Sequence, residues 1–189
     1  YMGCVREEIP TQSDKFWPMT WGIKEDSTFG VMNPPPLSEI YLHQHNELVG
    51  NTWARHLEEF SKFVSEYASG NVLEIGSGHG LLAGKVFSKE NKVTRWDKIE
   101  PNPLNETSEF GSFIQGFFPN PAISPKSYSS VVHSHVLEHT ISPFNFLSDC
   151  AEALVENGRI VASWPNMEKM AENKDLNLLM FEHLTFLPC

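Results

Sequence analysis

VLEIGSGHG, residues 72–80, is an apolar segment that runs directly into three glycines, each separated from the next by one residue. Glycine has no Cβ, so this backbone can turn sharply and can touch a ligand directly. The helix-compatible segment 81–90 follows, and its first turn would offer free N–H groups. The pattern predicts a strand, a tight turn and a helix around a ligand site, with Glu74 at the strand end. A tight turn without a ligand is the alternative.

Further apolar segments along the chain read as strands. They cover residues 92–101, 112–118, 129–137 and 159–164. Apolar strands that alternate with helices indicate a mostly parallel sheet with helices on both faces. We therefore predict an α/β, Rossmann-like fold, whose ligands lie beyond the carboxyl ends of the strands.

Two helices have clear signals. One carries an apolar stripe at helical spacing, formed by Trp53, Leu57, Phe60, Val64 and Tyr67. Asn51 or Thr52 is expected to cap its start and Gly70 to end it. The other begins at Ser142 as N-cap with Pro143 at the first helical position, and Gly158 is expected to close it.

The composition is that of a globular protein. The chain has 189 residues, of which 40% are hydrophobic and 20% charged. This size predicts one domain at residues 41–189 and, because residues 1–40 are rich in proline and lack periodicity, an irregular N-terminal arm. The net charge of -10 disfavours nucleic acid as a partner.

No apolar run reaches the roughly 18 residues of a membrane span, so we expect no membrane partner. The three cysteines, Cys4, Cys150 and Cys189, are far apart and form no CxxC pair. A disulfide framework is therefore not expected, and we predict a cytoplasmic protein.

The glycine spacing separates two cofactor classes. Dinucleotide enzymes use G-x-G-x-x-G, but the sixth position of that frame is Leu81. The form G-x-G-x-G, with an acid two residues before it, resembles motif I of class I methyltransferases, which bind S-adenosylmethionine. The carboxylate suits the ammonium and sulfonium groups of that cofactor. A nicotinamide-dependent oxidoreductase is the less favoured alternative.

A second acid follows the next predicted strand, in KIEPNP (98–103). In nucleotide-binding folds an acid at this point accepts hydrogen bonds from ribose hydroxyls. Asp97 and Glu100 fall on opposite faces of the strand, so only one can face the cofactor. We predict Glu100, because it stands at the strand end.

The resemblance implies a fuller set of cofactor contacts. Gln115 is expected at the adenine edge, with Phe117 or Phe118 as an apolar wall, although the family often has an acid near Gly116. The segment SHVLEH (134–139) resembles the part of these methyltransferases that lines the site after the fourth strand. The expected cofactor-binding residues are Glu74, Gly76, Ser77, Gly78, Gly80, Glu100, Gln115, Phe117, Ser134 and His135.

His133, His135, Glu138 and His139 lie within seven residues, which invites a metal-site interpretation. Strand alternation and the following turn do not obviously bring them together, and H-E-x-x-H is absent. The sequence therefore predicts no metal.

Segments 41–60 and 181–186 look like parts of the deoxysugar C-methyltransferase group. The resemblance implies catalytic roles for Glu182 and His183, with His139 near them, and His183 as a base. The tyrosine that often precedes this pair is replaced by Phe181. The group also begins with a cysteine-rich zinc module, but only Cys4 stands near this start.

These observations predict methyl transfer from S-adenosylmethionine to a small molecule, a sugar nucleotide or another metabolite, at carbon or oxygen. A non-catalytic partner subunit that binds the cofactor or its demethylated product is the alternative. Folds of this type have seven strands and we count five, so we expect that the last two are lacking. An uncovered sheet edge would then favour a homodimer or a missing C-terminal region.

Overall fold

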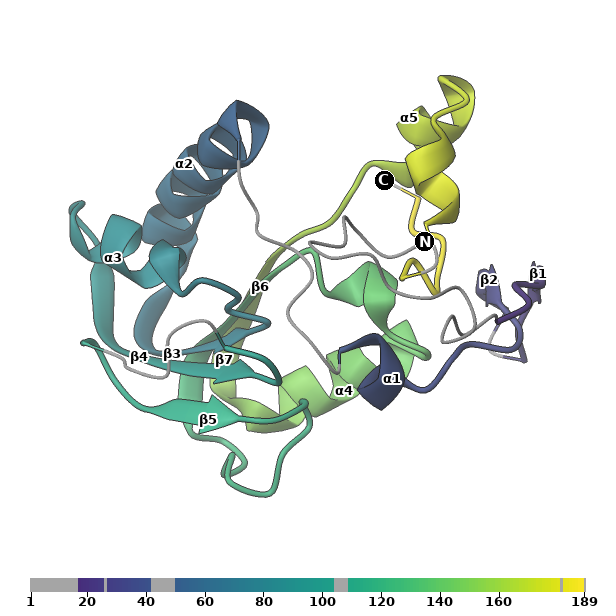
Figure 1. The fold of residues 1–189 in the computed structure, drawn as a ribbon. Helices are drawn as coiled ribbons and strands as arrows, with labels where there is room; N and C mark the ends of the chain where they lie inside the picture. Colours follow the sequence, from purple (N-terminus) through teal and green to yellow (C-terminus); the bar gives the residue numbers. More distant parts are fainter. Residues whose placement is uncertain (1–16, 26, 42–49, 104–108, 181, 189) are drawn as a thin grey trace, which may run out of the picture.

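A computed structural model describes residues 17–25, 27–41, 50–103, 109–180 and 182–188. Its centre is a parallel sheet with the strand order β5-β4-β3-β6-β7 (Figure 1). The strands are β3 (Ser69–Ile75), β4 (Lys92–Glu100), β5 (Phe113–Gln115), β6 (Tyr128–Ser134) and β7 (Leu154–Ser163). The predicted Rossmann-like fold is confirmed, with five strands in this parallel sheet.

Helices cover both faces of the sheet. On one face, α2 (Asn51–Tyr67) and α3 (Leu81–Phe87) pack against Val72 and Trp96. On the other face, α4 (Pro143–Ala153) packs against Leu73 and Ile99. Alternating residues of β3 and β4 thus enter different cores, because side chains of a strand point to opposite faces in turn. Both faces are buried, as expected for a parallel sheet.

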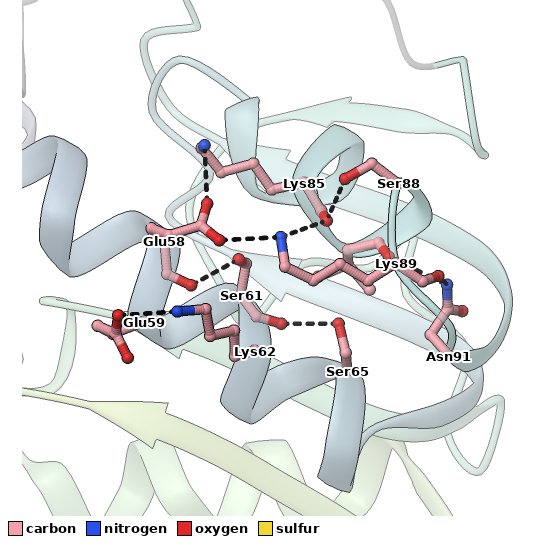
Figure 2. Close-up of polar contacts among 10 residues, drawn as sticks. Glu58, Glu59, Ser61, Lys62, Ser65, Lys85, Ser88, Lys89 and Asn91 are labelled. Carbon is pink, nitrogen blue, oxygen red and sulfur yellow. Dashed lines mark hydrogen bonds and ion pairs between the residues drawn. The ribbon is translucent and has the colours of Figure 1, made fainter.

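Glu58 on α2 links this helix to the region of α3 (Figure 2). Its carboxylate lies 3.2 Å from Lys85 Nζ and 3.3 Å from Lys89 Nζ. Hydrogen bonds from Lys85 and then Lys89 lower the pKa of Glu58. All three side chains contact solvent, so the contribution to stability is small. The ion pairs nevertheless fix α2 beside the helix that follows the glycine loop.

Several predicted helix ends are shifted in the structure. Gly50, with φ 99°, is the N-cap of α2, so neither Asn51 nor Thr52 caps it. The helix ends at Tyr67, and Gly70, with φ 62°, lies inside β3. The left-handed conformation of this glycine was expected correctly. However, Gly70 does not end the helix but lies at the start of β3, where the β3–β4 register shifts.

At α4 the predicted start is confirmed and the predicted end is wrong. The hydroxyl of Ser142 accepts a hydrogen bond from Asn145 N, and Pro143 is the first helical residue. The helix ends at Ala153, and Gly158 lies inside β7. The sequence placed the strand start later because Glu156 and Asn157 interrupt the apolar pattern.

The described part of residues 1–40 is more regular than the sequence indicated. It contains an antiparallel pair, β1 (Trp21–Ile23) and β2 (Phe29–Val31), and a short helix, α1 (Leu37–Ile40). The pair also contacts the end of the chain (Figure 1): Val31 N donates to Leu184 O at 2.8 Å, and Phe186 N donates to Phe29 O at 2.8 Å. Three-residue strands that pair with a distant segment leave too little local pattern to predict.

The remaining elements are short. A 3-10 turn, η2 (Leu137–His139), follows β6, and α5 (Met167–Glu172) and η3 (Leu176–Leu179) follow β7. Among the described residues, no helix combines the length and apolar character that crossing a membrane requires.

Candidate active site

A cavity of about 320 Å³ lies where the carboxyl ends of β3, β4 and β6 meet. The loops after these strands, helix α2 and the C-terminal segment contribute to its wall. Most of the predicted site residues line it: Glu74, Gly76, Ser77, Gly78, Glu100, Phe117, Ser134, His135, His139, Glu182 and His183. The structure thus brings residues from both halves of the sequence into one cavity.

Two predicted residues do not line this cavity. Gln115 is exposed, and its side-chain amide donates to Pro101 O at 3.4 Å. Gly80 is the N-cap of α3 with φ 69°, and a Cβ there would lie 2.7 Å from Lys98 Nζ. Glycine is therefore required here by close packing against Lys98, and the predicted cofactor contact of Gly80 stays a prediction. After β5 the cavity is lined by Gly116, Phe117 and Phe118.

The glycine loop requires glycine for conformational reasons. Gly76 and Gly78 have φ values of 72° and 49°, which other residues adopt at a cost. A Cβ on Gly76 would lie 2.5 Å from Val136 Cγ2 of the neighbouring loop. The bare backbone therefore lets the two loops approach each other. The N–H groups of Gly76 and Gly80 donate within the protein, to Ile99 O at 3.0 Å and to Ser77 O at 2.7 Å.

Glu100, the last residue of β4, is hydrogen-bonded to the glycine loop. Its Oε2 accepts a hydrogen bond from Gly78 N at 3.0 Å, and its Oε1 accepts one from Asn102 N at 3.1 Å. A carboxylate offers about four lone-pair positions, so it can accept further bonds from a ligand. Glu100 is therefore held at the cavity with acceptor capacity left.

Asp97 points to the opposite face of β4, as strand alternation predicts. It accepts hydrogen bonds from Ser112 N at 2.6 Å and Tyr128 Oη at 3.1 Å, and Arg95 Nε lies 2.9 Å away. Asp97 does not line the cavity. Its contacts are structural, so Glu100 is the acid of the pair that faces the cavity.

Glu74 lies at the buried base of the cavity. Trp96 Nε1 donates to its Oε2 at 2.7 Å. Burial raises the pKa of Glu74 to about 7, although the Trp96 hydrogen bond and the nearby Lys98 oppose the shift. The carboxyl group therefore changes charge near neutral pH, and a cationic ligand would favour its ionised form.

Histidines and carboxylates gather on the other side of the cavity. Glu138 is 0% exposed, and its Oε1 lies 3.1 Å from His135 Nδ1 and 3.8 Å from His139 Nε2. His139 Nδ1 donates to Glu182 O at 2.9 Å, and His183 Nδ1 donates to Leu178 O at 3.3 Å. Residues from the β6 loop and from the chain end thus form one cluster.

The sequence suggested that the histidines and the glutamate at positions 133–139 do not come together, and this is correct only for His133. His135 adopts φ 54° beyond the end of β6, and this left-handed residue turns the chain so that Glu138 and His139 face the cavity. His133 remains in the strand and packs its ring against Phe146 at a centroid distance of 5.3 Å. The sequence could not show the turn, because left-handed conformation is uncommon for a residue other than glycine.

Burial shifts the pKa values in this region. Burial, and then the charge of His139, lower the pKa of His183. For Glu138, burial alone would raise the pKa, but the contact with His135 and the charge of His139 lower it overall. Burial lowers the pKa of His133 to about 4. His133 is therefore neutral at pH 7.

Hydrogen bonds hold the turn after β6 and the C-terminal segment, which carry the two halves of the cluster, together. Glu138 O accepts hydrogen bonds from Leu184 N at 2.8 Å and Thr185 N at 3.1 Å. Lys24 Nζ, from the turn between β1 and β2, donates to Ile141 O at 2.8 Å and to Leu184 O and Thr185 Oγ1 at 3.0 Å each. The N-terminal hairpin therefore positions the segment that carries Glu182 and His183.

Sequence reasoning missed an aromatic wall of the cavity. Trp53 and His56 of α2 contact the ring of His135 at centroid distances of 4.8 and 5.0 Å. His56 Nε2 lies 2.8 Å from Ser134 Oγ, so His56 connects α2 to the end of β6. Its position three residues after Trp53, on the same face of the helix, was the available signal. Tyr41 and Asn102 also line the cavity.

The sequence of the chain matches a known protein family. A family model described as a methyltransferase domain matches residues 42–188. The match covers most of the chain, so the protein belongs to this methyltransferase domain family. A search of curated protein sequences found no match.

Solved methyltransferase structures share the fold at low sequence identity. A chain from the complex between the Haloferax volcanii Trm112 methyltransferase activator and a methyltransferase is 15% identical, with a TM-score of 0.50 over 65% of this chain and 68% of that one. A protein assigned as a methyltransferase from Bacillus halodurans is 15% identical, with a TM-score of 0.51 over 69% of this chain and 62% of that one.

A third structure is described as a sarcosine dimethylglycine methyltransferase from Galdieria sulphuraria. It is 16% identical, with a TM-score of 0.46, and the match covers 55% of this chain and 44% of that one. Two of these three matches thus span less than two thirds of the other protein's length.

Proposed function

We propose that this protein transfers the methyl group of S-adenosylmethionine to a small-molecule acceptor. The observation that carries the proposal is a pair of features at one cavity. The glycine loop and Glu100, joined by the Gly78–Glu100 hydrogen bond, form one wall, and the cluster of His139, Glu182 and His183 forms another. Membership of the methyltransferase domain family supports this assignment.

The first wall has the donors and acceptors that the cofactor needs. Glu74 and the loop backbone would face its ammonium-bearing end, and Glu100 would accept hydrogen bonds from the ribose. Asn102 Nδ2 and His79 Nε2 are buried at the cavity without a hydrogen-bond partner among the described residues. Unpartnered buried groups of this kind are costly, so a polar ligand that pairs with them fits the site.

The second wall has the residues that an acceptor needs. Methyl transfer breaks the bond between sulfur and the methyl carbon, forms a bond from that carbon to the acceptor, and releases the neutral thioether. An acceptor hydroxyl or carbon acid must also lose a proton. We propose His183 as the group that takes it, with Glu182 and His139 as neighbours that hold the acceptor. A positioned base contributes about 10²–10⁴-fold to a rate.

The acceptor is proposed as a sugar nucleotide or another small metabolite, methylated at oxygen or carbon. The resemblance of residues 181–186 to the deoxysugar C-methyltransferase group supports this choice. Phe181 itself lies outside the described residues.

Calorimetric titration with S-adenosylmethionine, S-adenosylhomocysteine and NAD tests the cofactor assignment. We expect the first two to bind with one site per chain and NAD not to bind. Binding of NAD alone would favour an oxidoreductase, and binding of none would remove the proposal. Candidate acceptors are then tested by mass spectrometry for the added methyl group. A chain that binds the cofactor, but whose turnover does not change with His183→Ala, would contradict the proposed base.

A further inference from the structure

Three metal-ligand groups converge on the acceptor side of the cavity. They are the Glu138 carboxylate and the imidazoles of His139 and His183, and one ligand atom from each lies within 4.8 Å of the other two. Glu138 and His139 come from the turn after β6, and His183 comes from the chain end. All three residues line the cavity.

Both imidazoles are oriented to present a lone pair. Nδ1 of His139 contacts Glu182 O, and Nδ1 of His183 contacts Leu178 O. A carbonyl oxygen can only accept, so Nδ1 carries the hydrogen in each ring. Nε2 of each neutral ring is therefore free to bind a cation. Metal-binding histidines in proteins are commonly fixed in this way, by a hydrogen bond from the other ring nitrogen to a carbonyl or carboxylate.

Glu138 is a buried carboxylate that lacks adequate compensation. It is 0% exposed, and neither oxygen has a hydrogen bond of good geometry within the described residues. His135 Nδ1 lies 3.1 Å from its Oε1. A buried ionised group of this kind is costly unless a positive partner or strong donors face it.

The cavity wall offers no permanent cation for that purpose. Among the described residues that line it, none is lysine or arginine, whereas four are glutamates: Glu74, Glu100, Glu138 and Glu182. The sulfonium cofactor would sit at the glycine loop, near Glu74 and Glu100. A cation bound beside Glu138 would supply the positive partner that this part of the wall lacks.

We propose that Glu138, His139 and His183 bind a divalent transition metal ion, with zinc as the best match. Two imidazoles and one carboxylate form a ligand set typical of catalytic zinc, in which a fourth position stays open to the substrate. Magnesium prefers oxygen ligands and does not suit this set. Metal–ligand distances of about 2.0–2.2 Å require the three side chains to draw closer when the ion binds. This proposal departs from the expectation from sequence that no metal binds, because the three side chains converge.

The consequence for catalysis rests on the proposed methyl transfer. A metal ion facing the cavity would bind an acceptor oxygen and lower its pKa. His183 is then a ligand, and Glu182, whose Oε2 lies 3.9 Å from His139 Nδ1, is left to take the acceptor proton. The metal-bound and metal-free proteins thus differ in which residue acts as the base.

Cobalt titration tests the site, because Co²⁺ replaces zinc and its visible absorption reports its ligands. Tag-free protein is stripped with a chelator and titrated with Co²⁺, and then with Zn²⁺ or Mg²⁺ as competitor. We expect one Co²⁺ per chain, displaced by Zn²⁺ and not by Mg²⁺. Glu138→Gln and His183→Gln should weaken binding at least tenfold. Glu59→Gln removes an exposed carboxylate of α2 that does not line the cavity and should leave the affinity unchanged.

No cobalt spectrum, or equal affinity in all three variants, would overturn the proposal. Circular dichroism checks that each variant folds. If the cluster variants unfold, X-ray absorption at the zinc edge of the unaltered protein decides instead: two imidazoles with oxygen ligands support the site, and sulfur ligands or fewer imidazoles refute it. S-adenosylmethionine binding, measured on the same samples, separates failure of the metal site from failure of the proposed function.

Discussion

His139 Nδ1 lies 2.9 Å from the main-chain oxygen of Glu182, and this contact joins two segments that are 43 residues apart in the sequence. It fixes the orientation of the His139 ring and sets Glu182 and His183 against the turn after β6. The acceptor side of the cavity therefore depends on how the chain end is held, which leads to the first prediction.

Lys24→Met should loosen the chain end without affecting the glycine loop. The variant loses hydrogen bonds from Nζ to Ile141 O, Leu184 O and Thr185 Oγ1. Bonds from a charged donor contribute about 1.5–3 kcal/mol each at most, so we expect a loss of roughly 1–3 kcal/mol in unfolding free energy. Chemical denaturation measures this loss, and calorimetry should show unchanged S-adenosylmethionine affinity. Lys62→Met is the control, because Lys62 forms only an exposed pair with Glu59.

Gly78→Val should abolish cofactor binding. Gly78 has φ 49°, which a β-branched residue adopts poorly, and its N–H donates to Glu100. We expect a loss of at least tenfold in S-adenosylmethionine affinity, measured by calorimetry. Gly84→Ala in α3 is the matched control, since a Cβ there meets no atom within 4 Å. It should retain affinity and gain about 1 kcal/mol in stability from helix propensity. Equal affinity in both variants would contradict a ligand role for the loop.

Glu100→Gln should weaken cofactor binding, whereas Asp97→Asn should lower the unfolding free energy. Glu100 faces the cavity, so its loss should weaken cofactor binding by about 1–3 kcal/mol. Asp97 accepts from Ser112 N and Tyr128 Oη on the other face, so its loss should reduce the unfolding free energy and leave affinity unchanged. Calorimetry and urea denaturation of both variants check the pair of effects. If Asp97→Asn were the variant that loses affinity, the assignment of Glu100 to the ribose would be wrong.

Glu74 should make cofactor affinity depend on pH. Its pKa is raised to about 7 in the folded protein, so the carboxyl group is mostly neutral below that pH. A cationic cofactor favours the ionised form, so affinity should rise as pH increases through about 7. Binding near that pH should release a proton, which calorimetry detects from the dependence on buffer ionisation enthalpy. Glu74→Gln should remove both effects; a persistent pH dependence would assign them to another group.

His133 should make the fold sensitive to acid. Its pKa is lowered to about 4 by burial, and neither ring nitrogen has a hydrogen-bond partner among the described residues. The unfolded chain binds a proton at about pH 6.5, so stability falls as pH decreases from there toward 4, by roughly 3 kcal/mol. His133→Leu should reduce this loss, as measured by denaturation at several pH values. An unchanged acid sensitivity would mean that His133 gains a partner when protonated.

The sequence by itself determined the elements that depend on local patterns. Apolar segments indicate β3 to β6, the glycine spacing indicates the loop at 76–80, and Ser142 with Pro143 indicates the start of α4. Strand alternation also separated Glu100 from Asp97 correctly. These predictions succeeded because the period of side-chain burial and the left-handed glycines are properties of neighbouring residues.

Only the tertiary structure decided which side chains meet. The hairpin of β1 and β2 holds Leu184 by hydrogen bonds between distant segments, and this brings His183 to Glu138 and His139. Tertiary contacts also join Gln115 to Pro101 O outside the cavity and place His56, beside Ser134, in its wall. Such contacts depend on how separate elements pack, and no local period of the sequence encodes that packing.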